Sequence, residues 1–90
     1  MKKVIKFYAN WCGPCKVYAK TFDKVSEDIK AEGLHVEFVN VNVEKDTTGL
    51  AAKYKVNGIP TTVVIDEEGF SKSETGRLNE DKLRSFILDE

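Results

Sequence analysis

The two cysteines of the chain, Cys12 and Cys15, are separated by two residues in the stretch KFYANWCGPCK, residues 6–16. Thiols at this spacing suit three kinds of chemistry: a structural disulfide, a pair of metal ligands, or a redox reaction. A structural disulfide here would close a loop of about four residues and stabilise the fold by only about 2 kcal/mol before strain. Zinc and iron–sulfur sites need four ligands, and the chain adds only one histidine, His35. Loop length and ligand count therefore argue against the first two.

A redox role uses every feature around the pair. Cys12 lies at the predicted start of a helix, where unpaired N–H groups and the helix dipole stabilise a thiolate. A thiol with a pKa near 8.5 is about 3% ionised at pH 7, whereas one near 7 is about half ionised. Gly13 lets a second chain approach the sulfur, and Pro14 suits the first helical positions. We interpret Cys12 as the attacking, exposed thiol and Cys15 as the thiol that resolves a mixed disulfide.

The elements that position this pair follow from hydrophobic spacing. Residues 3–8 (KVIKFY) form a β-branched and aromatic run that is typical of a strand. From Pro14 onward the pattern becomes helical, and one face carries apolar residues at spacings of four, three and four: Tyr18, Phe22, Val25 and Ile29. Gly33 is expected to follow the end of this helix in a left-handed conformation.

Three further strands are predicted downstream. In residues 35–43 (HVEFVNVNV) the apolar alternation shifts between Phe38 and Val39, which indicates two partly buried faces or a bulge. Residues 61–65 and 70–75 are expected to pair as a hairpin across the turn DEEG.

Two shorter helices complete the prediction. Thr47 or Thr48 should cap a helix that runs to Tyr54, and Asn79 should cap the last helix. The long first helix is expected to cross over the sheet and make the first two strands parallel. We therefore predict a single α/β domain over residues 1–90, with a mixed four-stranded sheet flanked by helices.

Composition and charge narrow the range of partners. With 14 basic and 15 acidic residues the formal net charge is −1, so nothing in the charge balance suggests nucleic acid or an acidic membrane. No apolar run is long enough for a bilayer span or for a signal peptide. We expect a monomer in the cytoplasm, a reducing compartment where permanent disulfides are rare.

WCGPCK, residues 11–16, resembles the active-site motif of the thioredoxin family. The segment GIPT, residues 58–61, is similar to the family's second motif, an isoleucine before a cis-proline that faces the cysteines, and Gly76 matches a glycine that borders the substrate groove. The resemblance covers nearly the whole chain and implies the thioredoxin fold, here as a minimal βαβ-α-ββα core. It implies a dithiol–disulfide oxidoreductase that takes electrons from a reductase and passes them to protein disulfides. No bound cofactor is implied beyond the redox-active disulfide of Cys12 and Cys15.

The resemblance also implies how substrates bind. An apolar patch around Cys12 would hold an extended polypeptide, and the backbone of Ile59 would hydrogen-bond to it. Pro60 has no N–H that could reach the thiols. The residues of this patch would be Trp11, Gly13, Pro14, Ile59, Pro60 and Gly76.

Three departures from the family pattern carry their own expectations. The chain starts at the strand that leads into the cysteines, so the strand at residues 35–43 should lie at a sheet edge. Lys20 replaces a proline that kinks the first helix, which predicts a straighter helix. Lys6 stands six residues before the first cysteine, in place of a buried aspartate that accepts the proton of the resolving thiol. Lys6 either extends to solvent or, as a cation near the pair, lowers the thiolate pKa values, and Lys16 is the other nearby cation.

Two alternative functions fit part of the pattern. A glutaredoxin-like enzyme would take its electrons from glutathione, which suits the length of the chain. The motif WCGPC argues against this, and the sequence from Gly76 to Asn79 lacks the Gly-Gly-x-Asp pattern that would hold glutathione. A thioredoxin fold can also serve as a binding module in which the cysteines are incidental. We expect protein disulfides as substrates and either a thioredoxin reductase or glutathione as electron donor, with no nucleic acid, membrane or metal.

Overall fold

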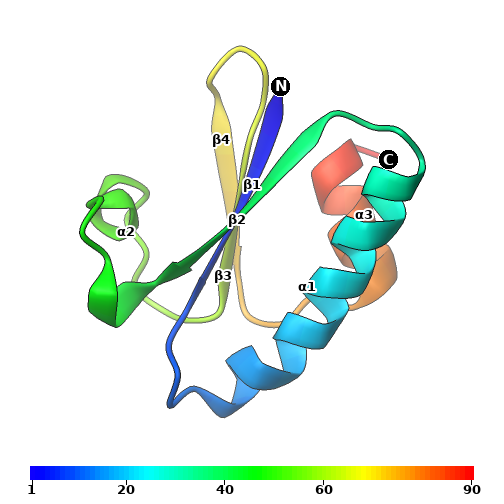
Figure 1. Ribbon diagram of the computed structural model, residues 1–90. Helices are drawn as coiled ribbons and strands as arrows, with labels where there is room; N and C mark the ends of the chain where they lie inside the picture. The colour runs from blue at the N-terminus through cyan, green and yellow to red at the C-terminus, as the bar shows by residue number, and fades with distance from the viewer.

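Strand β1 (Lys2–Tyr8) lies inside the sheet and pairs with a neighbour on each side. In the computed structural model, which describes residues 1–90, the strand order is β2-β1-β3-β4 (Figure 1). The parallel pairing of β1 with β2 and the antiparallel hairpin of β3 with β4 are as the sequence predicts, and β1 also pairs antiparallel with β3. The remaining elements are α1 (Gly13–Ala31), β2 (Val36–Asn42), the 3-10 helix η1 (Val43–Lys45), α2 (Leu50–Lys53), β3 (Thr61–Ile65), β4 (Ser71–Thr75) and α3 (Glu80–Leu88).

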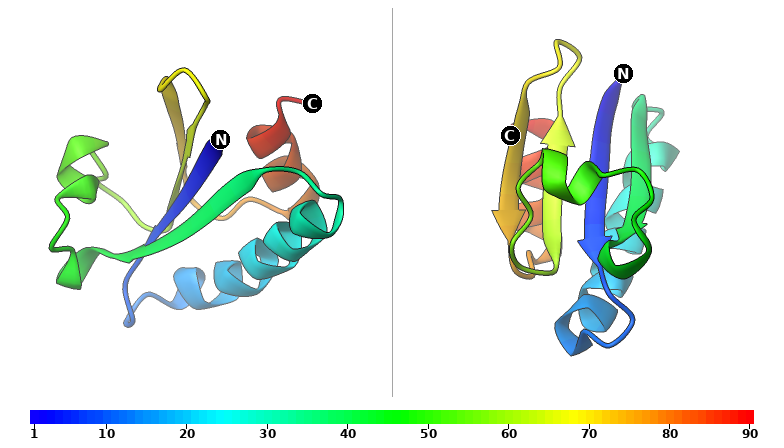
Figure 2. Two further views of the ribbon diagram at one scale, coloured as in Figure 1. Left: turned by 45° about the horizontal axis from the view of Figure 1, so that its top comes forward. Right: turned by 90° about the vertical axis from the view of Figure 1, so that its left-hand side faces the viewer.

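The two faces of the sheet are covered unequally. Helices α1 and α3 pack side by side on one face, whereas only the short helix α2 and its loops cover the other (Figures 1 and 2). The core under α1 and α3 joins residues from both layers: Val4, Tyr18, Phe22, Val25, Ile29, Val64, Leu83 and Ile87. A smaller cluster on the α2 side contains Ile5, Phe7, Val41 and Val63. No helix combines the length and the apolar character that crossing a bilayer requires.

Helix α1 has the boundaries and the buried face that its spacing predicts. Cys12 takes the N-cap position and Pro14 lies in the first turn. The predicted apolar stripe is buried, and the helix runs without interruption through Lys20. After the C-cap Glu32, Gly33 has a φ of 78°, which confirms its predicted left-handed conformation.

Strand β2 lies at one edge of the sheet, as expected. Its register with β1 is continuous from Val36 to Asn42, so the shift in its pattern reflects two partly buried faces and no bulge. Phe38 packs on the core under α1, whereas Val39 and Val41 pack on the α2 side.

The predicted cap of α2 is wrong. Gly49 is the N-cap, with a φ of 75° and no side-chain hydrogen bond. Asp46 organises the turn instead, because its carboxylate accepts hydrogen bonds from the N–H groups of Thr48, Gly49 and Ala51. The two carboxylate oxygens offer about four acceptor sites against two on a threonine hydroxyl, and the Thr48 hydroxyl accepts only one longer bond, from the N–H of Leu50 at 3.3 Å. The cap of α3 is as predicted: Asn79 accepts a bond from the N–H of Lys82 at 2.8 Å.

A buried hydroxyl pair joins α1 to the sheet close to the cysteines. The hydroxyl groups of Tyr18 and Thr62 lie 2.6 Å apart, and both residues are almost fully buried. Burial raises the pKa of Tyr18 to about 12, and its bond to Thr62 opposes that shift in part. Each hydroxyl is the buried partner of the other.

We expect Tyr18→Phe to lower the free energy of unfolding by about 1–3 kcal/mol, because the Thr62 hydroxyl is then buried without a partner. Urea denaturation measures this change. The double variant Tyr18→Phe/Thr62→Val should recover much of the loss, since neither partner remains. A double variant as unstable as the sum of the single variants would contradict this explanation.

The same residue makes stability depend on alkaline pH. Because the fold raises the pKa of Tyr18 from 10.0 to about 12, its contribution is complete below pH 10 and is lost as the pH rises toward 12. Between pH 10 and 12 the free energy of unfolding of Tyr18→Phe, measured by urea denaturation, should therefore fall less than that of the wild type.

Candidate active site

The cysteine pair lies at the junction of β1 and α1. The loop after β1 turns at Ala9, whose carbonyl accepts a bond from the N–H of Cys12 at 3.2 Å. The N–H of Cys15 donates to Sγ of Cys12, also at 3.2 Å. The first turn contains no acidic residue. The sulfur of Cys12 therefore occupies the position at which a helix N-terminus stabilises negative charge.

Cys12 and Cys15 form a disulfide, with their Cα atoms 5.2 Å apart. Cys12 is 4% exposed and Cys15 is 3% exposed, so the expectation that Cys12 is the exposed thiol is wrong for the oxidised state. The two residues differ in what they face: Cys12 lines a surface groove, and Cys15 does not. With Ala9 they form a small apolar cluster, against which Tyr8, Val43 and Ile59 pack.

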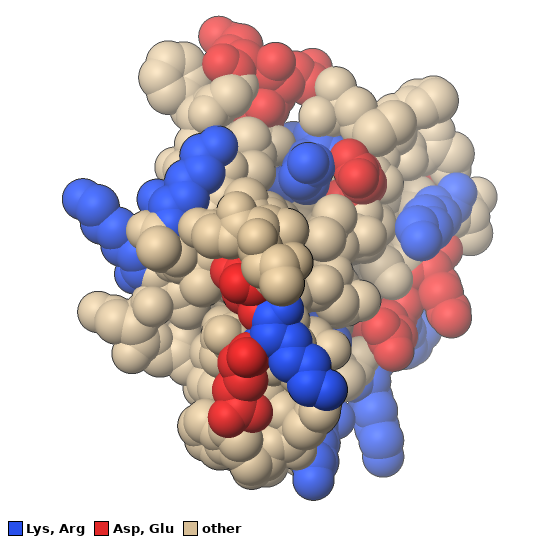
Figure 3. All heavy atoms as spheres, turned by 60° about the vertical axis from the view of Figure 1, so that its left-hand side comes forward, with Lys and Arg blue, Asp and Glu red and all other residues tan.

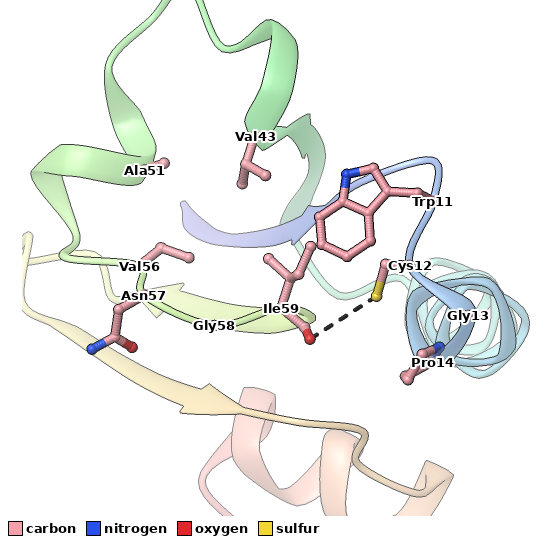
Figure 4. Close-up of a pocket in the computed structure, with 10 residues that line it drawn as sticks. All are labelled: Trp11, Cys12, Gly13, Pro14, Val43, Ala51, Val56, Asn57, Gly58 and Ile59. Carbon is pink, nitrogen blue, oxygen red and sulfur yellow. Dashed lines mark hydrogen bonds between the residues drawn. The ribbon is translucent and has the colours of Figure 1, made fainter.

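A second segment, far away in the sequence, faces the disulfide. The Ile59–Pro60 peptide bond is cis. The carbonyl oxygen of Ile59 lies 4.0 Å from Sγ of Cys12, the contact drawn as a dashed line in Figure 4. The N–H of Gly76 donates to the carbonyl of Pro60 at 2.8 Å and so fixes the β4–α3 loop beside this segment.

The groove between these segments has a volume of about 750 Å³. Figure 4 shows the Trp11 ring above the Cys12 sulfur and the Ile59 carbonyl facing that sulfur at the other end of the dashed line. Trp11 is 67% exposed, a large fraction for an indole. No charged residue is among the residues that line the groove: Trp11, Cys12, Gly13, Pro14, Val43, Ala51, Val56, Asn57, Gly58 and Ile59.

The structure brings together most, but not all, of the residues expected in the patch. Trp11, Gly13, Pro14 and Ile59 line the groove with Cys12, whereas Pro60 is buried and Gly76 lies outside the lining. The far wall, formed by Val43, Ala51, Val56, Asn57 and Gly58, was not anticipated. Its only signal in the sequence is the position of Asn57 and Gly58 directly before Ile59.

Lys6 lies on the sheet face beneath α1 and is 5% exposed. Its ammonium lies 5.5 Å from the centre of the Tyr8 ring and 5.1 Å from that of Phe22, at distances suited to cation–π contacts. It makes no hydrogen bond or ion pair, yet no buried nitrogen is left unpaired, so Nζ keeps contact with solvent. Burial lowers the pKa of Lys6, and the charge of Asp23 opposes the shift in part. The structure therefore agrees with a side chain that packs on the core and extends to solvent.

Outside the groove, charged side chains of both signs are distributed over the surface. On the face turned forward in Figure 3, acidic side chains gather at the top, and blue and red side chains are interspersed over the rest. Lys16 is exposed and makes no ion pair. His35 is also exposed, and no group of three or more potential metal ligands occurs in the structure.

Comparison with protein families and curated proteins gives one consistent result. The thioredoxin family model matches residues 1–89. The thioredoxin of Borreliella burgdorferi is 34% identical over 86 residues, which cover 96% of this chain and 70% of that protein. The thioredoxin of Mycoplasmoides gallisepticum is 30% identical over 86 residues, which cover 96% of this chain and 81% of that protein.

Solved structures agree with the family match. The X-ray structure of Fasciola hepatica thioredoxin has a TM-score of 0.82 and 35% sequence identity. The match covers 98% of this chain and 79% of that one.

Proposed function

The chain belongs to the thioredoxin family and is a thiol–disulfide oxidoreductase with an active-site cysteine pair, and from this premise we propose that it reduces disulfides in proteins. The observation that carries the proposal is the Cys12–Cys15 disulfide, with Cys12 facing an uncharged groove opposite Ile59 and the cis-proline. In this proposal Cys12 attacks the substrate and Cys15 resolves the mixed disulfide.

The proposed cycle begins with both cysteines reduced. The Cys12 thiolate attacks one sulfur of the substrate disulfide, forms a mixed disulfide and releases the other substrate sulfur as a thiolate. The Cys15 thiolate then attacks Sγ of Cys12, which forms the Cys12–Cys15 disulfide and releases the second substrate thiolate. Each cysteine thiol gives its proton to solvent before it attacks, and each released substrate thiolate takes one up from solvent, so that two electrons and two protons pass to the substrate in total. The N–H of Cys15 lies 3.2 Å from Sγ of Cys12 and would stabilise the attacking thiolate.

The groove supports an extended polypeptide as the substrate. Its apolar lining would take side chains next to the substrate cysteine, and the Ile59 backbone would pair with the substrate main chain. Trp11, Gly13 and Pro14 would form the wall beside Cys12. Pro60 and Gly76, which lie behind the lining, would hold the Ile59 segment in place through the bond between Gly76 and the Pro60 carbonyl.

The compartment and the electron supply follow from the proposed reaction. The protein would act as a monomer in a reducing cytoplasm, where a reductase returns the pair to the dithiol state. It would thus take part in electron transport and in redox homeostasis of the cell. A reducing compartment fits a thiol pair that donates electrons, because the pair must itself be reduced after each turnover.

Serine substitutions test the two cysteine roles. Cys15→Ser should accumulate a mixed disulfide with a protein substrate, because the attacking thiol remains and the resolving thiol is absent. Cys12→Ser should form no such adduct. Mass spectrometry under non-reducing conditions measures the adduct, and the double serine variant gives the background. Trapping by Cys12→Ser alone would reverse the assignment.

The electron donor is tested by following insulin reduction with each candidate. We expect faster turnover with NADPH and a thioredoxin reductase than with glutathione, because the groove offers no charged side chain for the carboxylates of glutathione. Arg77, the nearest candidate for such a contact in the β4–α3 loop, lines a separate hollow with Val17 and Leu78. Faster turnover with glutathione would favour the glutaredoxin-like alternative.

We further propose that Lys6 lowers the thiolate pKa values of the pair, with Lys16 as a second, exposed contributor. The Tyr8 ring that contacts the Lys6 ammonium also packs against the cluster of Cys12 and Cys15. A cation at this position favours the thiolate and makes the disulfide more oxidising.

Lys6→Met should therefore raise the thiolate pKa and make the reduction potential more negative. Thiolate absorbance and equilibration with a glutathione buffer measure the two quantities. Lys82→Met, an exposed position on α3, is the matched control, and Lys16→Met should give a smaller shift in the same direction. Values for Lys6→Met equal to those of the wild type would contradict the proposal. Because the partial burial of Lys6 disfavours its charged form, the variant should also resist urea better than the wild type.

A further inference from the structure

The far wall of the groove contains an asparagine followed directly by glycine. Asn57 and Gly58 lie outside every helix and strand, in the segment between α2 and the cis-proline. Asn57 is exposed and Gly58 is half-buried. Figure 4 shows the Asn57 side chain at the lower end of the far wall, with its amide directed away from Cys12.

Two amide groups decide how reactive this pair is: the side-chain amide of Asn57 and the backbone amide of Gly58. Neither makes a hydrogen bond within the protein. The carbonyl of Gly58 is fixed differently, since it accepts a bond from the Thr61 hydroxyl. The backbone nitrogen that follows Asn57 is therefore available, and the side chain beside it is free to rotate.

Close packing disfavours a side chain at position 58. A Cβ atom built on Gly58 would lie 3.1 Å from Cγ2 of Thr75, which is tighter than ordinary van der Waals contact, so the Thr75 side chain would have to shift. The φ of Gly58 is not positive, so packing and not backbone conformation opposes a larger residue there. With no side chain on Gly58, nothing shields its nitrogen from the neighbouring Asn57 amide.

We propose that Asn57–Gly58 is a site of spontaneous deamidation within the active-site groove. The Gly58 nitrogen, once its proton passes to solvent base, attacks the side-chain carbonyl carbon of Asn57. A carbon–nitrogen bond forms, the bond to the side-chain nitrogen breaks, and ammonia leaves. Water then opens the resulting five-membered succinimide at either carbonyl and gives aspartate or isoaspartate. One water is consumed, one ammonia is released, and no electrons are transferred.

The product places a negative charge in a groove whose lining has none. A carboxylate near Cys12 disfavours the thiolate, so deamidation raises the thiolate pKa and slows attack on a substrate. This consequence rests on the proposed role of Cys12, whereas the modification itself does not. The rate of disulfide reduction would then fall with time, as a growing fraction of the molecules becomes deamidated.

Peptide mass spectrometry after incubation in mildly alkaline buffer tests the site. We expect the amide-to-acid mass gain at residue 57 to exceed that at every other asparagine, each of which precedes a larger residue: Asn10, Asn40, Asn42 and Asn79. The variant Asn57→Gln should show no comparable gain. The variant Gly58→Ala/Thr75→Ser should slow it, because alanine shields the nitrogen while serine removes the methyl group that alanine would meet. Equal gains at all five asparagines would overturn the proposal.

The consequence is tested with Asn57→Asp, which carries the new charge from the start. Its insulin reduction should be about two- to fivefold slower than that of the wild type, the size of an exposed charge interaction, and its thiolate pKa should be higher. Asn57→Gln changes the same groove side chain without adding charge, so the effect of the charge is the difference between Asn57→Asp and Asn57→Gln in both quantities. An Asn57→Asp variant equal to Asn57→Gln overturns the effect on activity. A wild type that reduces no insulin would contradict the proposed function and leave the mass result intact.

Discussion

The N-cap position of Cys12 is the constraint on which the rest of the site depends. It places one sulfur at the positive end of α1 and directs it into the groove, while Cys15 follows one turn later within the cluster beneath. The helix can hold that position because its buried stripe, from Tyr18 to Ile29, packs into the core between the sheet and α3. Packing in the interior thus sets the positions of the two cysteine sulfurs.

The opposite side of the site depends on a different kind of contact. Ile59 and Pro60 meet the cysteine loop only because β3 pairs antiparallel with β1, which returns the chain to the same end of the sheet. The bond between Gly76 and the Pro60 carbonyl adds the β4–α3 loop to this support. The strands that adjoin these three short segments therefore place them at one end of the sheet, and the direct contacts of Pro60 with Gly76 and of Ile59 with Cys12 link them to one another.

Local patterns predicted the parts of the molecule that local physics controls. The stripe of α1, the conformation of Gly33, the cap at Asn79 and the mixed sheet all follow from periodicity and capping rules. Those rules missed the Asp46 turn, because a carboxylate and a threonine hydroxyl are both good caps and only the folded backbone decides between them. They also missed most of the far groove wall, since only the tertiary fold brings Val43, Ala51 and Val56 to the groove that Cys12 lines.

The two walls of the groove differ in how firmly they are built. The wall with Cys12 belongs to a helix of 19 residues, six of them buried, whereas α2 has four residues and none buried. A segment with so little buried surface opens locally at a small free-energy cost. The groove therefore has one wall that is anchored in the core through α1, and another whose α2 part can open at a smaller free-energy cost.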